Sequence, residues 1–204
     1  EAHLERLAAA GHEIVDISLP LFAKGLAAYY IVMPAEVSSN LARYDGLRYG
    51  SQASGETLLE VYERSRAEGF GAEVKRRILL GTYVLSAGYY DAYYGKAQAV
   101  RALMRDELSE VFASVDVIAT PTTPTPAFTF GAQADPLAMY QQDIFTVPVN
   151  LTGVPALSTP MGTVDRDGTA LPVGVQYIAP HSGDARLFDL GRRMYDTTLS
   201  QAEA

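Results

Sequence analysis

Apolar residues recur with helical spacing at the start of the chain and then with strand spacing. Leu4, Leu7 and Ala8 share one helical face, and Gly11 is placed to end that helix. Residues 14–19 alternate apolar and polar side chains, which predicts a short strand that stops at Pro20. The helical pattern is already under way at the first residue, without an initiator Met or an N-cap residue, so we expect a piece of a longer protein.

Helices and short buried strands alternate along the rest of the chain. Pro34 forces a kink in the first long helix, and Gly88 or Gly95 interrupts the longest one. The hairpin-type turn 165–168 joins the last two strands. In chain order the pattern predicts a helix over 21–44, a polar loop over 45–55, helices over 56–68 and 71–115, a strand over 116–120, an extended loop over 121–126, a helix over 136–145, strands over 156–159 and 173–178, and a helix over 183–199.

This alternation predicts an α/β fold, with residues 1–204 forming part of a single domain. About four strands can be counted, which are too few for a sheet that the helices could cover on both faces. We therefore expect a mixed central sheet covered by helices, with its remaining strands in a missing N-terminal part.

Composition and charge narrow the function classes. Hydrophobic residues make up 48% and charged residues 20% of the 204 residues, as in an ordinary globular protein. The net charge of −8 provides no overall field for nucleic acid or anionic lipid, and no apolar stretch approaches the length of a membrane-spanning helix. The absence of cysteine excludes disulfides, thiolate zinc sites and a cysteine nucleophile, and three scattered histidines disfavour a histidine-rich metal site.

No local arrangement in these residues is a catalytic centre. There is no Gly-x-Ser-x-Gly nucleophile elbow, no Gly-x-Gly-x-x-Gly and no phosphate-binding loop. None of the lysines, Lys24, Lys75 and Lys96, follows a serine by three residues. We therefore expect the chain by itself to be inactive.

Three features carry both a structural and a functional interpretation. The tyrosines of 89–94 are most simply core and interface aromatics, and Asn150 is most simply an amide that pins loops. The run Lys75-Arg76-Arg77 is usually a solvated helix face. Arg76 and Arg77 nevertheless point about 100° apart on a helix, so one can face inward, and a buried arginine demands a carboxylate.

Four segments together resemble the amidase signature family. Residues 27–50 and 69–96 are similar to the A subunits of the aspartyl/glutamyl-tRNA amidotransferases, whereas residues 121–128 and 148–156 are shared by amidases generally. The resemblance covers essentially the whole chain. It implies that the α/β fold is the C-terminal portion of the amidase signature fold.

The resemblance also implies an activity. The family's A subunit hydrolyses glutamine with a Ser–cis-Ser–Lys triad, which would lie in the missing N-terminal part, so no catalytic residue falls in this chain. The ammonia passes to a B subunit, which uses ATP and Mg²⁺ to convert Glu-tRNA(Gln) to Gln-tRNA(Gln), and a C subunit braces the pair. The chain itself would need no cofactor, would meet tRNA only through the complex and would be cytoplasmic.

Three residues match the family's glutamine pocket by motif. Tyr29 of the Ala-Tyr-Tyr segment would close one wall, and Arg77 of Lys-Arg-Arg would hold the α-carboxylate. Asp143, after the Pro-Leu-x-Met-Tyr segment, would hold the α-ammonium. A planar Arg fork and one carboxylate suit the anion and the cation of a free amino acid.

Two other functions stay open at this point. The chain can be the C-terminal part of a stand-alone amidase that acts on small amides. It can also be a non-catalytic binding or scaffold protein that has lost its catalytic half. The sequence leaves open whether the parent protein acts on Glu-tRNA or Asp-tRNA.

Overall fold

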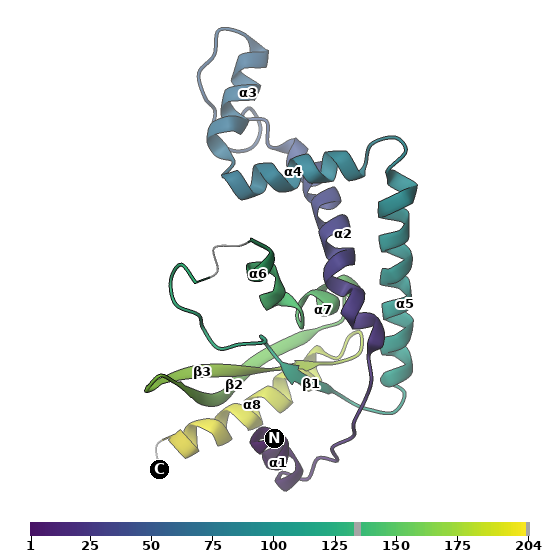
Figure 1. The fold of residues 1–204 in the computed structure, drawn as a ribbon, viewed down its shortest axis with the longest axis vertical. Coiled ribbons are helices and arrows are strands. Elements are labelled where there is room, and N and C mark those ends of the chain that lie inside the picture. Colours follow the sequence, from purple (N-terminus) through teal and green to yellow (C-terminus); the bar gives the residue numbers. More distant parts are fainter. Residues whose placement is uncertain (133–135, 203–204) are drawn as a thin grey trace. The chain divides into compact units, whose positions relative to one another are not determined.

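The computed structural model describes residues 1–132 and 136–202, and it divides into two compact units. Residues 1–26 and 101–204 form the sheet unit, and residues 27–100 form the helical unit (Figure 1). Each unit has its own packing and is described by itself.

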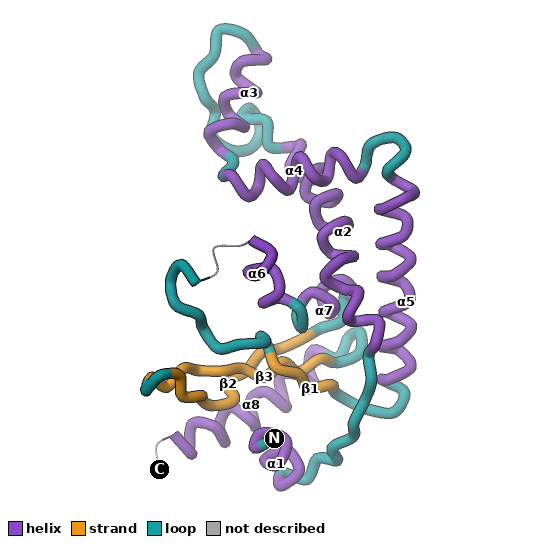
Figure 2. The backbone as a smooth tube through the Cα atoms, in the orientation of Figure 1, coloured by secondary structure: helices purple, strands orange, loops and turns teal. Residues whose placement is uncertain are grey.

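The sheet unit contains three antiparallel strands in the order β1-β3-β2 (Figure 2). They are β1 (Ile118–Pro121), β2 (Ala156–Arg166) and β3 (Thr169–Ile178), and Ile178 lies opposite both Ile118 and Ala156. The β2–β3 hairpin closes at Asp167 and Gly168, which both have positive φ, 53° and 79°. Asp and Gly tolerate that conformation best, so the predicted hairpin is confirmed with its turn.

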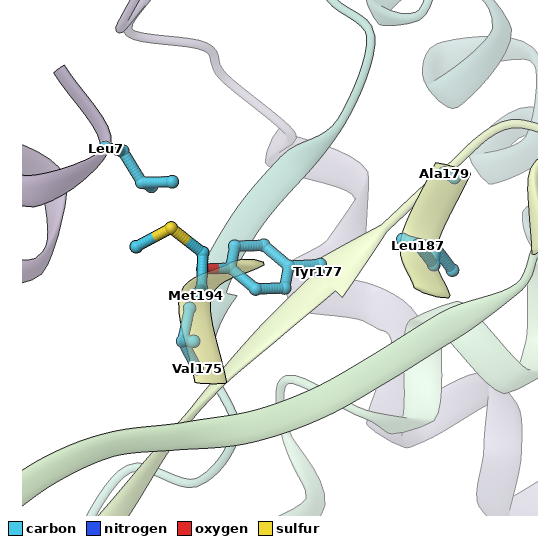
Figure 3. Packing of buried hydrophobic residues seen from close by; sticks show 6 residues of the cluster. All are labelled: Leu7, Val175, Tyr177, Ala179, Leu187 and Met194. Atoms are coloured by element: carbon cyan, nitrogen blue, oxygen red, sulfur yellow. The ribbon is translucent and has the colours of Figure 1, made fainter. Parts of the chain in front are cut away.

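Two helices cover one face of this sheet. The α1 helix (Ala2–Ala9) and the α8 helix (Asp184–Ala202) lie against it (Figure 1), and their apolar side chains meet those of β3 in one core (Figure 3). Gly191 allows the close approach of α8 to β2, because a Cβ there would lie 2.4 Å from Leu157 Cδ2. The buried members of this core are Leu7, Val175, Tyr177, Ala179, Leu187 and Met194.

A second core uses the alternate residues of the strands. Ile118 and Ile178 are buried with Leu108 of α5 (Lys96–Val111) and Val149 of α7 (Val147–Thr152). The structure therefore buries both faces of β3, as its apolar sequence near 173–178 predicts.

The helical unit is built from α2 (Gly25–Asn40), α3 (Leu58–Gly69) and α4 (Ala72–Val84). A π-helical turn, Tyr90–Gly95, leads directly into α5. Short 3₁₀ turns flank α2 at Pro20–Lys24 and Leu41–Arg43. In the sheet unit, α6 (Pro136–Tyr140) continues into a 3₁₀ turn at Gln141–Asp143.

Most predicted elements are confirmed, but one strand is wrong. Residues 12–19 form neither helix nor strand, and they make no ladder in the described part of the chain. An alternating sequence becomes a strand only when it pairs with another strand, and residues 12–19 pair with none in the described part of the chain. The described sheet therefore has three strands, all antiparallel, where the pattern predicts about four in this chain. The long helical signal is interrupted at Gly88, which has a φ of 85°.

Candidate functional site

The pairing of α2 with α4 in the helical unit brings Arg77 to Tyr29. Tyr29 and Met33 lie one turn apart on α2 and share a face. The Nη1 of Arg77 is 3.4 Å from the Tyr29 hydroxyl oxygen and 3.4 Å from Met33 Sδ, and it donates to both. Two of the three residues matched to the pocket thus meet through their side chains.

Gly81 makes this pairing possible. A Cβ at Gly81 would lie 1.9 Å from the carbonyl oxygen of Pro34, so α4 touches the backbone of α2 at this point. Beside it, the hydroxyls of Ser38 and Thr82 are hydrogen-bonded at 2.9 Å. Because Gly81 lies one turn after Arg77, this contact sets how far the guanidinium reaches towards Tyr29.

Glu73 holds the same guanidinium from the other side. The Nε of Arg77 donates to Glu73 Oε1 at 2.8 Å, and Arg76 forms an ion pair with the second carboxylate oxygen. The Arg77 side chain is 26% exposed and that of Arg76 is 58% exposed. The prediction that these neighbours point in different directions, one of them inward, is confirmed.

The charge on Arg77 is secure in this setting. Partial burial works against the charged form, but the hydrogen bonds with Glu73 and Tyr29 outweigh it and raise the pKa of Arg77 above its ordinary value. The site therefore presents a permanent, oriented cation, which is suited to a carboxylate ligand.

Asp143 belongs to the sheet unit. It ends the 3₁₀ turn that follows α6, is exposed, and accepts through its backbone carbonyl from Thr146 N at 3.1 Å. Asn150 donates from its side-chain amide to the carbonyl of Thr146, the N-cap of α7, at 2.9 Å, so the contact lies within its own helix and the interpretation that Asn150 pins loops stays a prediction. The meeting of Asp143 with Arg77 around one ligand stays a prediction.

The tyrosine cluster forms a stacked surface instead of a core. Tyr83, Tyr89 and Tyr93 follow one another with ring centroids 4.4 and 5.8 Å apart, and all three are exposed. The expectation of core aromatics is therefore wrong for Tyr89, Tyr90 and Tyr93, whereas the expectation of interface aromatics stays a prediction. Tyr90 and Tyr93 lie on the π-helical turn and Tyr89 directly before it, an irregularity that helical periodicity does not anticipate.

Sequence reasoning missed Glu73, Met33 and Gly81. The spacing of Glu73 four residues before Arg77 is a recognisable ion-pair signal. Met33 and Gly81 act through the crossing of two helices, which no local spacing reveals. In the described residues, no group of three or more His, Asp or Glu side chains could hold a metal ion, and no helix is long and apolar enough to cross a membrane.

Comparisons with known proteins place this chain in a family. The sequence profile of the Amidase family matches residues 1–188, so the chain belongs to that family. Within it, the chain is 52% identical over 185 residues to the A subunit of the glutamyl-tRNA(Gln) amidotransferase of Halothermothrix orenii and 60% identical over 174 residues to that of Granulibacter bethesdensis. These matches cover 90% and 84% of the chain but only 38% and 34% of the relatives.

Solved structures agree with the assignment of the fold. The A subunit of the glutamyl-tRNA(Gln) amidotransferase of Thermotoga maritima is similar with a TM-score of 0.64 and 40% identity, over 92% of this chain and 35% of that one. A crystal structure of an amidase is similar with a TM-score of 0.65 and 25% identity, over 93% of this chain and 39% of that one. The predicted α/β amidase fold, present as a part, is thereby confirmed.

Proposed function

We propose that this chain is part of the glutamine-hydrolysing A subunit of a tRNA-dependent amidotransferase and that it supplies the glutamine pocket. The observation that carries the proposal is the oriented guanidinium of Arg77 beside Tyr29. The identity of 52–60% to amidotransferase A subunits supports the substrate class.

In this proposal the side chains divide the recognition of free glutamine. Arg77 binds the α-carboxylate through charge-assisted hydrogen bonds, and Tyr29 forms a wall beside it. Asp143 binds the α-ammonium. The amide is then hydrolysed by a Ser–cis-Ser–Lys triad outside these 204 residues, so the chain by itself releases no ammonia.

The remaining steps belong to partner chains. A B subunit receives the ammonia and uses ATP and Mg²⁺ to amidate Glu-tRNA(Gln), and a C subunit braces the two. The net charge of −8 is consistent with a protein that leaves tRNA binding to a partner. Translation of this kind takes place in the cytoplasm, which is the location that we propose.

The two alternatives have less support. A stand-alone amidase acting on small amides is consistent with the fold, but the amidase structure is only 25% identical to this chain, against 40% for the Thermotoga maritima protein. For a truncated binding protein, no contact among the described residues gives specific support.

Substitution of the two neighbouring arginines tests the pocket in the full-length A subunit that contains this chain. Arg77→Ala removes the partner of the α-carboxylate and should cost roughly 2–4 kcal/mol of binding, which is about 30- to 1,000-fold in the KM or kcat/KM for glutamine. Asp143→Asn should act in the same direction but less severely, because an amide oxygen still accepts one hydrogen bond from the ammonium. Free ammonia should restore product formation in both variants, because it bypasses the pocket.

Arg76→Ala is the matched control, since Arg76 is adjacent and more exposed. It should leave the KM for glutamine close to that of the wild type. Equal losses for Arg76→Ala and Arg77→Ala would mean that the segment is a basic face or a subunit contact, and the proposed pocket would be wrong.

A further inference from the structure

Glu73 contacts both arginines of the Lys-Arg-Arg run, but with different consequences for the site. We propose that Glu73 is a positioning residue that orients the guanidinium of Arg77 for the carboxylate of the substrate. This inference rests on the proposed function, because it concerns the same pocket. It adds a residue that contacts the arginine and that the sequence motif did not single out.

The contacts show how Glu73 would act. The guanidinium of Arg77 is held at Nε by Glu73, at 2.8 Å, and at Nη1 by Tyr29 and Met33, each at 3.4 Å. The contact with Glu73 is the shortest of the three and joins two charged groups, so it is the strongest of them. An arginine that is fixed at Nε has its plane fixed as well, and the orientation of a planar fork decides whether it can bind a carboxylate through two nitrogen atoms.

Anchoring of this kind reduces the entropy that Arg77 loses when the substrate binds. A long side chain has many rotamers in the free protein, and it loses this conformational entropy when it is immobilised on a ligand. The Glu73 contact removes part of that freedom in the free protein, so less remains to be lost on binding. Because the Arg77 side chain is 26% exposed, water can also hydrogen-bond to its guanidinium. The contact with Glu73 keeps the guanidinium in place against that competition.

Arg76 also contacts Glu73, but the proposed pocket does not use Arg76. It pairs with the second carboxylate oxygen, so both arginines are accommodated at once. The Arg76 side chain is 58% exposed, and ion pairs of this exposure contribute little. Glu73 therefore acts on glutamine binding through Arg77 and not through Arg76.

The test uses the full-length A subunit that contains this chain, assembled with its partner subunits, and the variants Glu73→Ala and Glu73→Gln. Loss of a charge-assisted anchor should raise the KM for glutamine about 5- to 10-fold in Glu73→Ala, with kcat and ammonia-dependent amidation unchanged. Glu73→Gln keeps an oxygen for Nε and should recover part of the KM. Glu63→Gln, an exposed acid on α3, is the matched control and should leave the KM unchanged.

A structural role alone would give a different result. If Glu73 only stabilised the first turn of α4, its variants would lower the melting temperature without selectively raising the KM for glutamine. Any loss of activity that they cause would then add to the loss caused by Arg77→Ala. A positioning role predicts instead that the double variant Glu73→Ala, Arg77→Ala has the KM of Arg77→Ala alone. Additive losses would overturn the inference.

The arginine variant separates the two proposals. If Arg77→Ala raises the KM for glutamine and Glu73→Ala does not, the pocket stands and the positioning role of Glu73 is wrong. If Arg77→Ala leaves that KM unchanged, the pocket itself is wrong and the inference falls with it.

Discussion

His3 is buried at 5% exposure in the sheet unit and is hydrogen-bonded on both ring nitrogens. Arg6 donates to Nδ1 at 3.1 Å and also to the carbonyl of Met161 at 2.7 Å. We therefore assign the proton to Nε2, which donates to the Tyr177 hydroxyl at 2.6 Å. This network ties α1 to β2 and β3, above the core that Tyr177 shares with Leu7 (Figure 3).

The network predicts that the docking of α1 weakens in mild acid. Burial, followed by the nearby charge of Arg6, lowers the pKa of His3 below its ordinary value of 6.5. The unfolded state therefore takes up a proton that the folded state resists. The stabilisation from neutral His3 is complete above about pH 6.5 and is lost as the pH falls towards the lowered pKa of the folded state.

Hydrogen exchange of the α1 amides, corrected for intrinsic rates, measures this effect between about pH 7 and about pH 5.5, which is about one unit below the ordinary pKa of histidine. The protection of these amides should decrease in the wild type as the pH is lowered. It should stay constant in His3→Gln, because glutamine does not titrate. His181→Gln removes an exposed histidine and should keep the wild-type pH dependence. An unchanged pH dependence in His3→Gln would exclude His3 as its source.

Among the helices, the packing of α4 on α2 depends on one glycine. Replacing an interior helical glycine by alanine normally stabilises a helix by about 1 kcal/mol. At Gly81 the new Cβ would lie 1.9 Å from a backbone oxygen of Pro34, and backbone cannot move aside as a flexible side chain can. The steric term, about 1–3 kcal/mol for an overpacked contact, should therefore outweigh the gain in propensity.

We expect Gly81→Ala to lower the melting temperature of the full-length protein and to move Arg77 away from Tyr29. Gly69→Ala is the matched control, because nothing lies within 4 Å of a Cβ built at Gly69 and its backbone is not left-handed. Thermal melts of both variants, with the KM for glutamine as a second readout, test the prediction. A Gly81→Ala protein that is as stable as Gly69→Ala would show that the two helices can separate without cost.

The elements that the sequence predicts correctly are those with local signals. The Asp167-Gly168 turn and the interruption at Gly88 follow from the φ values that these residues tolerate, and the amphipathic helices follow from their spacing. The strand expected over 14–19 failed because pairing depends on a neighbour that no local pattern specifies. The site shows the same division. Arg77 could be matched by its motif, but its contact with Met33 and the close approach at Gly81 depend on how α2 crosses α4.

The unpaired edge of the sheet and the groove beside it predict whether the isolated chain associates. A groove of about 660 Å³ lies between residues 12–17 and the segment 114–119 that leads into β1. The outer edge of β1 has no partner strand in the described part of the chain. Beside it, Ile14, Val15 and Ile17 are 43%, 50% and 37% exposed. An unpaired edge next to exposed apolar side chains is a typical site of association.

The curated relatives are more than twice as long as this chain, which spans about 38% of the first of them. The open edge of its sheet predicts that the chain associates when it is isolated. The outer edge of β2 is better protected, because Pro160 and the register shift before Gly162 interrupt its ladder. Association should therefore proceed through β1 and its groove.

We expect the purified chain to form oligomers in a concentration-dependent way and to melt without a sharp two-state transition. Ala119→Lys places a charge on the exposed edge residue of β1, where its desolvation would oppose the pairing of a second strand, so it should reduce association. Ala102→Lys makes the same substitution on the exposed side of α5 and should leave association unchanged, which separates an edge effect from a general effect of added charge. Light scattering after size-exclusion chromatography, at low and high protein concentration, gives the mass of each variant. A wild-type chain that stays monomeric at every concentration and melts cooperatively would show that the sheet unit is complete without a further strand.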